Sequence, residues 1–301
     1  MSSPDVAPEI TPPEERIRLT SCAGPLPAAP RPLLARLLSP PGPPETRLFE
    51  HRDSSGTIKA AVLAVPGRYA VSYLIIGPRA IGIVDCGSEE DSSRILRALA
   101  WLGRPPSEVS WVMPSHLHFD HILGVDPLCQ RLGIPLALGP VAAEHVDSAR
   151  KLRFPPGLLF LRAVPTWPMQ GMPVFTRADW RGGDFGFPWS RNQFGARRGP
   201  VFRDGEPLDG LPGWILIETP GHADDALSLF HEEAGWLVSG DTLRNFLGGE
   251  WNPLLCDREA YSLTRRRLGD LQVRLVMPGH GPVFETPKGL GKLETRPWWQ
   301  P

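Results

Sequence analysis

The 301 residues are enough to bury a sizeable core, and 41% of them are hydrophobic. The formal net charge of −1 at pH 7 gives no whole-molecule field that would attract nucleic acid or an anionic membrane surface. No uncharged apolar run approaches the roughly 18 residues that a membrane-spanning helix needs. We therefore expect a protein without nucleic-acid or membrane partners.

The cysteines and the N-terminus bear on the compartment. Cys22, Cys86, Cys129 and Cys256 are widely spaced and form no Cys-x-x-Cys pair, which predicts unpaired thiols in a reducing compartment. The first residues lack the basic region and apolar stretch of a secretory signal. These features predict a cytoplasmic protein.

Proline divides the chain into an arm and a domain. Residues 1–45 contain the pairs Pro12-Pro13, Pro40-Pro41 and Pro43-Pro44. Proline lacks a backbone donor and fixes φ, so this arm cannot be a central strand or a long helix. We predict an extended or disordered arm over 1–45 and one domain over 46–301.

Strands and helices alternate through the domain. Apolar, partly β-branched runs predict strands over 60–65, 70–76 and 81–84, and a helix over 88–101 begins at the N-cap residue Ser88. This alternation is typical of an α/β fold. The remaining predicted strands are 109–113, 135–138, 214–218, 226–230, 236–239 and 273–277, and the remaining helices are 122–132, 141–150 and 258–271.

The pattern lapses over about 151–210, a stretch rich in Gly, Pro, Trp, Phe and Arg. Long irregular segments inside compact domains are usually functional or disordered, and the aromatic residues argue against disorder. We predict an aromatic-rich insertion that forms a lid or wall over the functional site. A packed insertion far from the chemistry is the alternative.

A run of three imidazoles and a carboxylate follows the predicted strand 109–113. Its members are His116, His118, Asp120 and His121, so three of the eight histidines of the chain fall within six positions. Imidazole is the commonest metal-ligand side chain, and a neighbouring carboxylate suits a divalent ion of intermediate softness. The run predicts a metal site.

Three residues downstream extend this pattern. His222 and His280 each follow a Pro-Gly pair beyond an apolar strand, and Asp241 ends the strand between them. Two carboxylate oxygens would let Asp241 bridge two ions. His51, His145 and His231 lack such a context and are predicted to be surface or structural residues.

This set of residues resembles the ligand set of the metallo-β-lactamase superfamily, from about Lys59 to about Glu285. The resemblance implies an αββα sandwich of two mixed β-sheets flanked by helices, and a dinuclear site. By resemblance, His116, His118 and His222 hold one ion, Asp120, His121 and His280 hold the second, and Asp241 bridges them. The spacing alone indicates a metal cluster and not this partition. Asp85 has a parallel in the family and is assigned to orienting a ligand histidine.

Substitutions within the pattern bear on the subfamily. Flavodiiron oxidoreductases have a glutamate where this chain has His118, and quorum-signal lactonases have a tyrosine where it has Arg244. The runs around Asp241 and His280 look more like hydroxyacylglutathione-hydrolase-type relatives. Arg244 could bind a substrate carboxylate or stabilise an oxyanion, or it could be a surface arginine in an ion pair.

The pattern favours a hydrolase that cleaves an ester, thioester or lactone bond in a small molecule. Two divalent ions, foremost Zn²⁺ with Fe or Mn as alternatives, would share a hydroxide that attacks the carbonyl, and Asp120 would deliver a proton to the leaving group. The aromatic insertion predicts a substrate with an apolar or aromatic acyl part. Two alternatives remain open: a mononuclear-iron oxidoreductase of the persulfide-dioxygenase type, and a nuclease using the arginines at 197–198 and 265–267.

Overall fold

The computed structural model describes residues 46–148, 150–158, 186–187, 189–246 and 248–293, and the backbone of 18–21. Most of the predicted arm, the centre of the predicted insertion and the last residues of the chain lie outside the described residues. Within them, the strands form an eight-stranded sheet, a five-stranded sheet and a two-stranded ribbon.

The eight-stranded sheet runs in chain order from β1 to β8, antiparallel from β2 to β5 and parallel at both ends. Its strands are β1 (Arg18–Ser21), β2 (Arg47–Arg52), β3 (Ile58–Pro66), β4 (Val71–Ile76), β5 (Ile81–Val84), β6 (Val109–Met113), β7 (Leu136–Leu138) and β8 (Arg198–Val201).

The five-stranded sheet has the order β15-β14-β11-β10-β9, and only its β11–β14 pair is parallel. Its strands are β9 (Trp214–Glu218), β10 (Leu227–His231), β11 (Trp236–Gly240), β14 (Leu275–Pro278) and β15 (Phe284–Glu285). The ribbon pairs β12 (Leu243–Arg244) with β13 (Glu250–Trp251).

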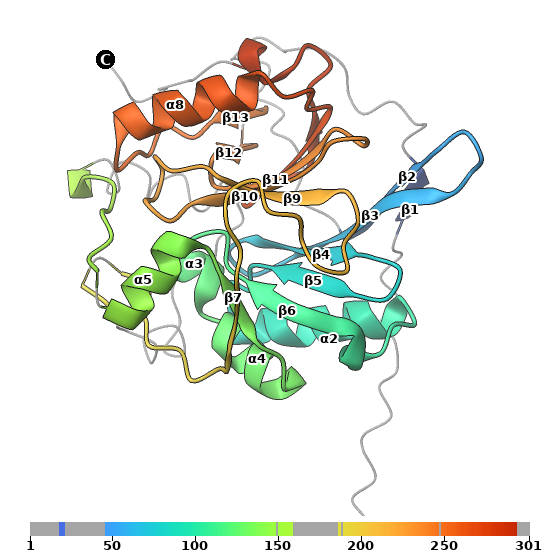
Figure 1. Cartoon of the computed structure of the whole chain (residues 1–301), viewed down its shortest axis with the longest axis horizontal. Helices are drawn as coiled ribbons and strands as arrows, with labels where there is room; N and C mark the ends of the chain where they lie inside the picture. Colours follow the sequence, from blue (N-terminus) through green and yellow to red (C-terminus); the bar gives the residue numbers. More distant parts are fainter. Residues whose placement is uncertain are drawn as a thin grey trace, which may run out of the picture.

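The helices lie on the outer faces of the two sheets. Figure 1 shows α2 (Glu89–Trp101), α4 (Val125–Leu132) and α5 (Pro140–Ser148) on the side of the larger sheet, and α8 (Arg258–Gly269) on the side of the smaller sheet. The short elements are α3 (Phe119–Ile122) and the 3-10 turns η1 (Pro106–Glu108) and η4 (Leu290–Lys292). The predicted αββα sandwich of two mixed sheets is confirmed.

Side chains point alternately to the two faces of each strand, so the two faces of a sheet pack into different apolar cores. In β3, Val62 and Ala64 face the core between the two sheets, while Leu63 and Val65 face the core beneath α2 and α4. Successive strand residues point to opposite faces, so a strand that is apolar at every position can be buried on both sides. A third core lies between the smaller sheet and α8.

The predicted helix over 122–132 is wrong at its start. The structure has the short helix α3 within the ligand run, where it carries Asp120 and His121, and a break before α4. The chain passes so close to the α2 N-cap here that a Cβ on Gly124 would lie 2.0 Å from the Ser88 carbonyl oxygen. The break lets the ligand run turn at its own short helix before α4 begins.

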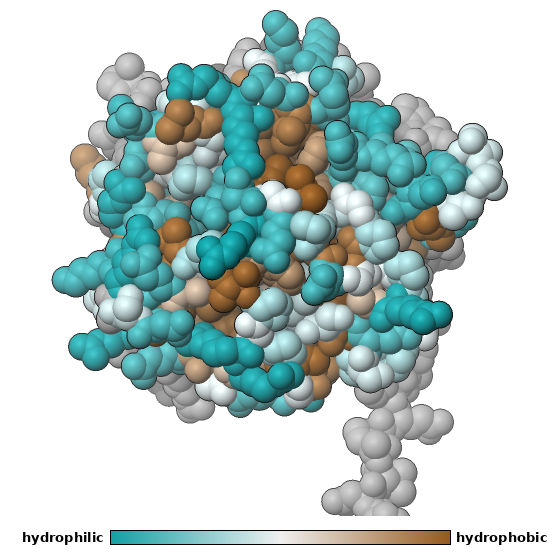
Figure 2. Space-filling model, viewed as in Figure 1, coloured by the Kyte–Doolittle hydropathy of each residue, from teal (hydrophilic) through white to brown (hydrophobic). Residues whose placement is uncertain are grey.

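The sequence patterns did not predict several of the short strands. β2, β12, β13 and β15 are short or rich in charged residues, so they lack a long apolar alternation. The predicted irregular segment over 151–210 is also wrong near its end, because β8 there pairs with β7. Among the described residues, no helix combines the length and apolar character that crossing a bilayer requires. On the face drawn in Figure 2, hydrophilic side chains surround separate apolar patches.

Candidate metal site

The predicted site residues follow the ends of strands from both sheets. Asp85 comes after β5, the 116–121 run after β6, His222 after β9, Asp241 after β11 and His280 after β14. Parallel strands end at one edge of a sheet, so β5 and β6 deliver their loops together, as do β11 and β14. The sandwich brings the two sets of loops face to face.

The seven predicted ligands converge in space. Their donor atoms form three groups in which all atoms lie within 4.8 Å of one another. These groups are His116 with His118 and His222, His116 with His121 and Asp241, and Asp120 with His121 and His280. The first and third correspond to the partition that the resemblance implied.

Asp241 lies between the groups. Its Oδ1 is 3.4 Å from Nε2 of His121, and its Oδ2 is 3.6 Å from Nε2 of His222 and 3.4 Å from Nε2 of His280. No other carboxylate among the described residues is placed against all three of these rings. One carboxylate therefore faces histidines of both groups, as a bridging ligand must.

Hydrogen-bond partners outside the cluster orient four of the five candidate histidine rings. Each of these rings turns its Nε2 toward the cluster and has its Nδ1 hydrogen-bonded elsewhere. The Nδ1 atoms contact Ser115 Oγ (3.1 Å, from His116), Asp85 Oδ2 (2.8 Å, from His121), the Leu254 carbonyl (2.6 Å, from His222) and the Tyr69 carbonyl (3.1 Å, from His280). Such contacts fix the orientation and tautomer of a ligand histidine.

His118 is oriented differently. Its Nδ1 faces the cluster, 2.9 Å from Nε2 of His116 and 3.1 Å from Nε2 of His222. Its Nε2 is buried without a hydrogen-bond partner in the described part of the chain, and its ring packs 4.4 Å from the ring of Phe154. His118 is therefore the one ring of the five without a hydrogen-bonded outer partner among the described residues.

The first group is a set of neutral imidazoles. Burial lowers the pKa of His118 to about 3, and it also lowers the pKa of His116 and His222. Neighbouring imidazoles add to this effect because each would repel a second positive charge. Three neutral nitrogens are the form in which histidine binds a metal ion.

The second group attracts positive charge. Burial opposes the charge on His280, but the carboxylates of Asp241 and Asp120 outweigh it and raise the pKa of His280 to about 9. Asp85 and Asp241 likewise raise the pKa of His121 well above its usual value against burial. In the metal-free protein these carboxylates therefore keep the two rings protonated. The protons occupy the place that a bound cation would take.

These residues fit a metal cluster. Nε2 of His121 and Oδ1 of Asp241 are buried 3.4 Å apart without forming a well-aligned hydrogen bond, so both atoms are placed to bind a further ligand between them. The second Pro-Gly-His turn also has a steric reason for its glycine, because a Cβ on Gly279 would lie 2.6 Å from Oδ1 of Asp241. Imidazole nitrogens with carboxylate oxygens suit zinc, iron or manganese.

Asp85 connects the site to the larger sheet. It is buried with φ of 63°, and its Oδ1 accepts a 2.6 Å hydrogen bond from the Ser115 backbone. Its Oδ2 faces Nδ1 of His121 and accepts a hydrogen bond from Ser115 Oγ at 2.9 Å. The structure thus places Asp85 where the sequence predicted, behind a candidate ligand.

We expect Asp85→Asn to weaken metal binding by about 10–100-fold, because an amide nitrogen in place of Oδ2 cannot accept the hydrogen bond from His121. Competition against a chromophoric chelator measures this affinity. Asp126→Asn, which changes another carboxylate that accepts a backbone N–H, is the control. Equal affinities of the Asp85 variant and the parent would contradict the expected role.

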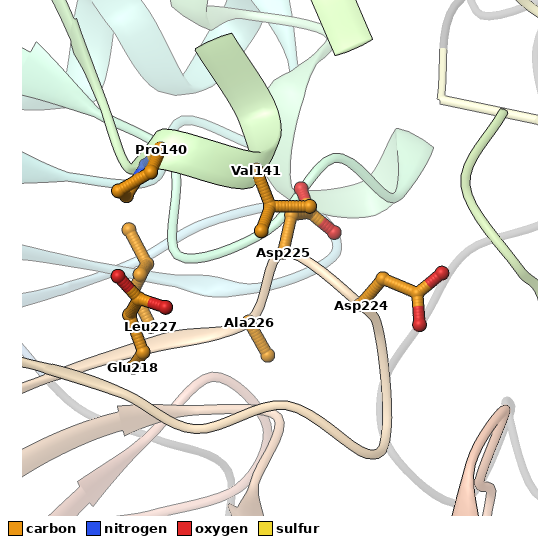
Figure 3. Close-up of a pocket in the computed structure, with 7 residues that line it drawn as sticks. All are labelled: Pro140, Val141, Glu218, Asp224, Asp225, Ala226 and Leu227. Atoms are coloured by element: carbon orange, nitrogen blue, oxygen red, sulfur yellow. The ribbon is translucent and has the colours of Figure 1, made fainter. Parts of the chain in front are cut away.

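Asp225 is a site-supporting residue that the sequence patterns missed. Its Oδ2 accepts a 2.9 Å hydrogen bond from the Leu117 backbone, between two candidate ligands, and burial raises its pKa to about 7. Figure 3 shows Asp225 beside Val141 of α5, while the side chain of Asp224 points away from both. The residues drawn there line a pocket, and none of the seven candidate ligands is among them. Asp225 follows His222 by three residues, and an aspartate at this spacing forms no motif that would have predicted its role.

The raised pKa of Asp225 predicts a pH-dependent stability of the metal-free protein. Between pH 3.8 and about 7, the unfolded chain releases this proton while the folded protein keeps it, so stability falls as the pH rises through that interval. We expect Asp225→Asn to be more stable than the parent at pH 8 by on the order of 4 kcal/mol, with little difference at pH 4.

Urea unfolding at pH 4, 6 and 8 measures this difference. The exposed Asp209→Asn should show no pH-dependent gain. A gain from Asp225→Asn that is the same at all three pH values would show that ionisation of Asp225 is not its source.

Arg244 is buried in the β12–β13 ribbon. Its side chain is 3% exposed, and its Nε lies 2.9 Å from Oε1 of Glu250, its partner across the β12–β13 ribbon. Burial lowers the pKa of Arg244. The alternative expected from the sequence for Arg244 is a surface arginine in an ion pair. The structure shows the ion pair, but inside the protein.

The described ends of the predicted insertion lie near the ligand run. His145, predicted as surface or structural, is buried; its Nδ1 contacts the Arg150 carbonyl and its Nε2 lies 3.0 Å from Nδ2 of Asn192. The carbonyl of Gly186, inside the insertion, accepts a 3.1 Å hydrogen bond from the Phe119 backbone N–H. These contacts place described parts of the insertion beside the ligand run and beside α5.

The family of the chain follows from comparison with known proteins. The model of the metallo-beta-lactamase superfamily matches residues 65–280, well over half of the chain. The chain therefore belongs to the metallo-beta-lactamase superfamily, a superfamily of metallo-hydrolases, as its ligand run predicted.

Individual relatives are more distant. Over 241 residues the chain is 27% identical to the probable metallo-hydrolase YqjP of Bacillus subtilis (strain 168), covering 73% of this chain and 70% of that protein. It is 37% identical over 70 residues to the beta-lactamase-like protein 2 homolog of Caenorhabditis elegans, covering 23% and 22%. The crystal structure of metallo-beta-lactamase family protein TTHA1429 from Thermus thermophilus superposes with a TM-score of 0.53 at 22% identity, covering 78% of this chain and 76% of that one, and shows a shared fold.

Proposed function

We propose that this protein is a metal-dependent hydrolase that cleaves an ester, thioester or lactone bond with two divalent ions, foremost zinc. The observation that carries the proposal is the convergence of two histidine groups on the shared carboxylate of Asp241. His116, His118 and His222 would hold one ion, and Asp120, His121 and His280 the other. Ions bound there would supply an ionised water and polarise the substrate carbonyl.

Asp120 is the residue suited to moving protons. Burial opposes its ionisation, but the hydrogen bond and charge of His280 and the charge of His121 outweigh burial and lower the pKa of Asp120. Its carboxylate is therefore ionised at neutral pH, and its side chain is 14% exposed, enough to meet substrate. We propose that it takes up a proton and returns it to the leaving-group oxygen or sulfur.

The arginine clusters support a small-molecule substrate rather than a nucleic acid. Arg267 pairs with Asp204 at 2.7 Å, and Arg198 lies 3.6 Å from Asp147. The Arg265 guanidinium lies 5.1 Å from the ring centroid of Trp251. Each of these charges has a partner within the protein, as expected for ordinary surface arginines.

The test combines metal analysis with a substrate panel. Protein purified without chelator is analysed for bound metals and assayed against thioesters, lactones, aryl esters and phosphodiesters. About two zinc ions per chain with turnover of an ester-type substrate supports the proposal. One iron per chain with oxygen uptake on a persulfide would replace it with an oxidoreductase, and turnover of phosphodiesters alone would also reject it.

A further inference from the structure

Two half-buried phenylalanines stand beside the site, one against each histidine group. The ring of Phe154 lies 4.4 Å from the ring of His118 at an interplanar angle of 39°. The ring of Phe246 lies 6.0 Å from the ring of His280 at 40°. Both side chains are partly exposed, so each keeps apolar surface next to a polar cluster.

Phe154 is held in place through its neighbour Arg153. The Arg153 backbone N–H donates to Oδ2 of Asp224 at 2.9 Å, and its guanidinium contacts Asp224 at 2.7 Å and Asp257 at 2.8 Å. Asp224 lies in the loop that carries His222, and Asp257 is the N-cap of α8. The backbone at Phe154 is thus tied to the site loop itself.

Phe246 is supported from the ribbon. The buried guanidinium of Arg244 lies 4.8 Å from its ring centroid, and Glu250 fixes that guanidinium. The backbone N–H of the intervening Asn245 donates to the His280 carbonyl at 3.0 Å. Arg244 thus contacts a ring that lies beside His280.

We propose that Phe154 and Phe246 form the walls of the acyl-binding subsite and select substrates with a flat apolar acyl group. The inference deepens the proposed function and rests on it. A planar ring placed beside either wall would bury apolar surface and stack on a ring that is already fixed. A substrate with a small acyl group would reach the same catalytic residues without these contacts.

The experiment measures ligand binding apart from turnover. Acetate, hexanoate and benzoate are titrated calorimetrically into the zinc-loaded protein. In the parent we expect benzoate to bind at least about tenfold more tightly than acetate. In Phe154→Ala and Phe246→Ala, benzoate should weaken about 5–10-fold and acetate less than about twofold, with the zinc content unchanged.

Further variants sharpen the result. Phe154→Leu, which is apolar but not planar, should retain hexanoate affinity and lose the preference for benzoate. Phe194→Ala makes the same chemical change in a half-buried phenylalanine packed under the helices, and should leave all three affinities unchanged. If an alanine variant fails to fold, the leucine variant at the same position carries the test.

The outcomes separate the subsite from the proposed function. A benzoate preference that disappears in the variants, in a protein that hydrolyses no ester, would reject the proposed function and leave the subsite standing. Equal loss of acetate and benzoate affinity, or loss of zinc, would show that the rings only support the histidines and would overturn the subsite. A parent without benzoate preference would overturn it as well.

Discussion

Removing the bound metal is expected to abolish ester hydrolysis and to lower the thermal stability of the protein. The candidate ligands are mostly buried, and Nε2 of His121 and Oδ1 of Asp241 face each other at 3.4 Å without a well-aligned hydrogen bond. Without cations, Asp85 and Asp241 keep a proton on His121, and Asp241 and Asp120 keep one on His280, because they raise the pKa of these rings. We expect turnover to fall at least about 1000-fold, because no ionised water is available at neutral pH.

Chelation followed by titration with zinc tests this expectation. Activity should return in proportion to added zinc and level off near two equivalents, and loading at pH 7 should release protons from the two rings. Ligand linkage at about 1000 times the dissociation constant contributes about 4 kcal/mol, which corresponds to a rise of about 10 °C in Tm. Full activity of protein that retains almost no metal would reject the metal-dependent mechanism.

Asp241→Asn is expected to reduce kcat/KM by at least about 1000-fold and to lower the metal content below two ions per chain. Asp241 is the carboxylate that faces His121, His222 and His280 together. Asparagine has a similar shape but only one acceptor oxygen and no charge, so it cannot offer a negative oxygen to both groups. The loss should therefore affect metal stoichiometry and turnover together.

The measurement pairs metal analysis with steady-state kinetics on the best ester substrate. Asp204→Asn changes an aspartate on the protein surface that pairs with Arg267, and it should leave both quantities unchanged. Unfolding of the Asp241 variant is followed in parallel, so that loss of the fold is recognised. A folded variant with two ions and parental kcat/KM would show that Asp241 does not bridge the groups.

The sequence alone determined much of the fold and of the candidate site. Long apolar runs such as 60–65 and 109–113 are strands in the structure, and Ser88 caps α2 as predicted. These features are local: alternation, branching and capping depend on neighbours in the chain. The seven candidate ligands were also recognisable, because histidines and aspartates at strand ends form a pattern that few other functions require.

Only the tertiary structure decided how these residues are supported and what surrounds them. Arg244, a candidate for substrate contact, is buried against Glu250 because β13 pairs with β12, and Asp225 lies behind the ligand run because the loop after β9 folds under it. The ring of Phe154 contacts the ring of His118, and the neighbouring Arg153 forms an ion pair with Asp224 that holds this segment against the loop after β9. Such contacts join residues far apart in the chain, and their partners carry no local periodicity or motif, so only the packed sandwich could reveal them.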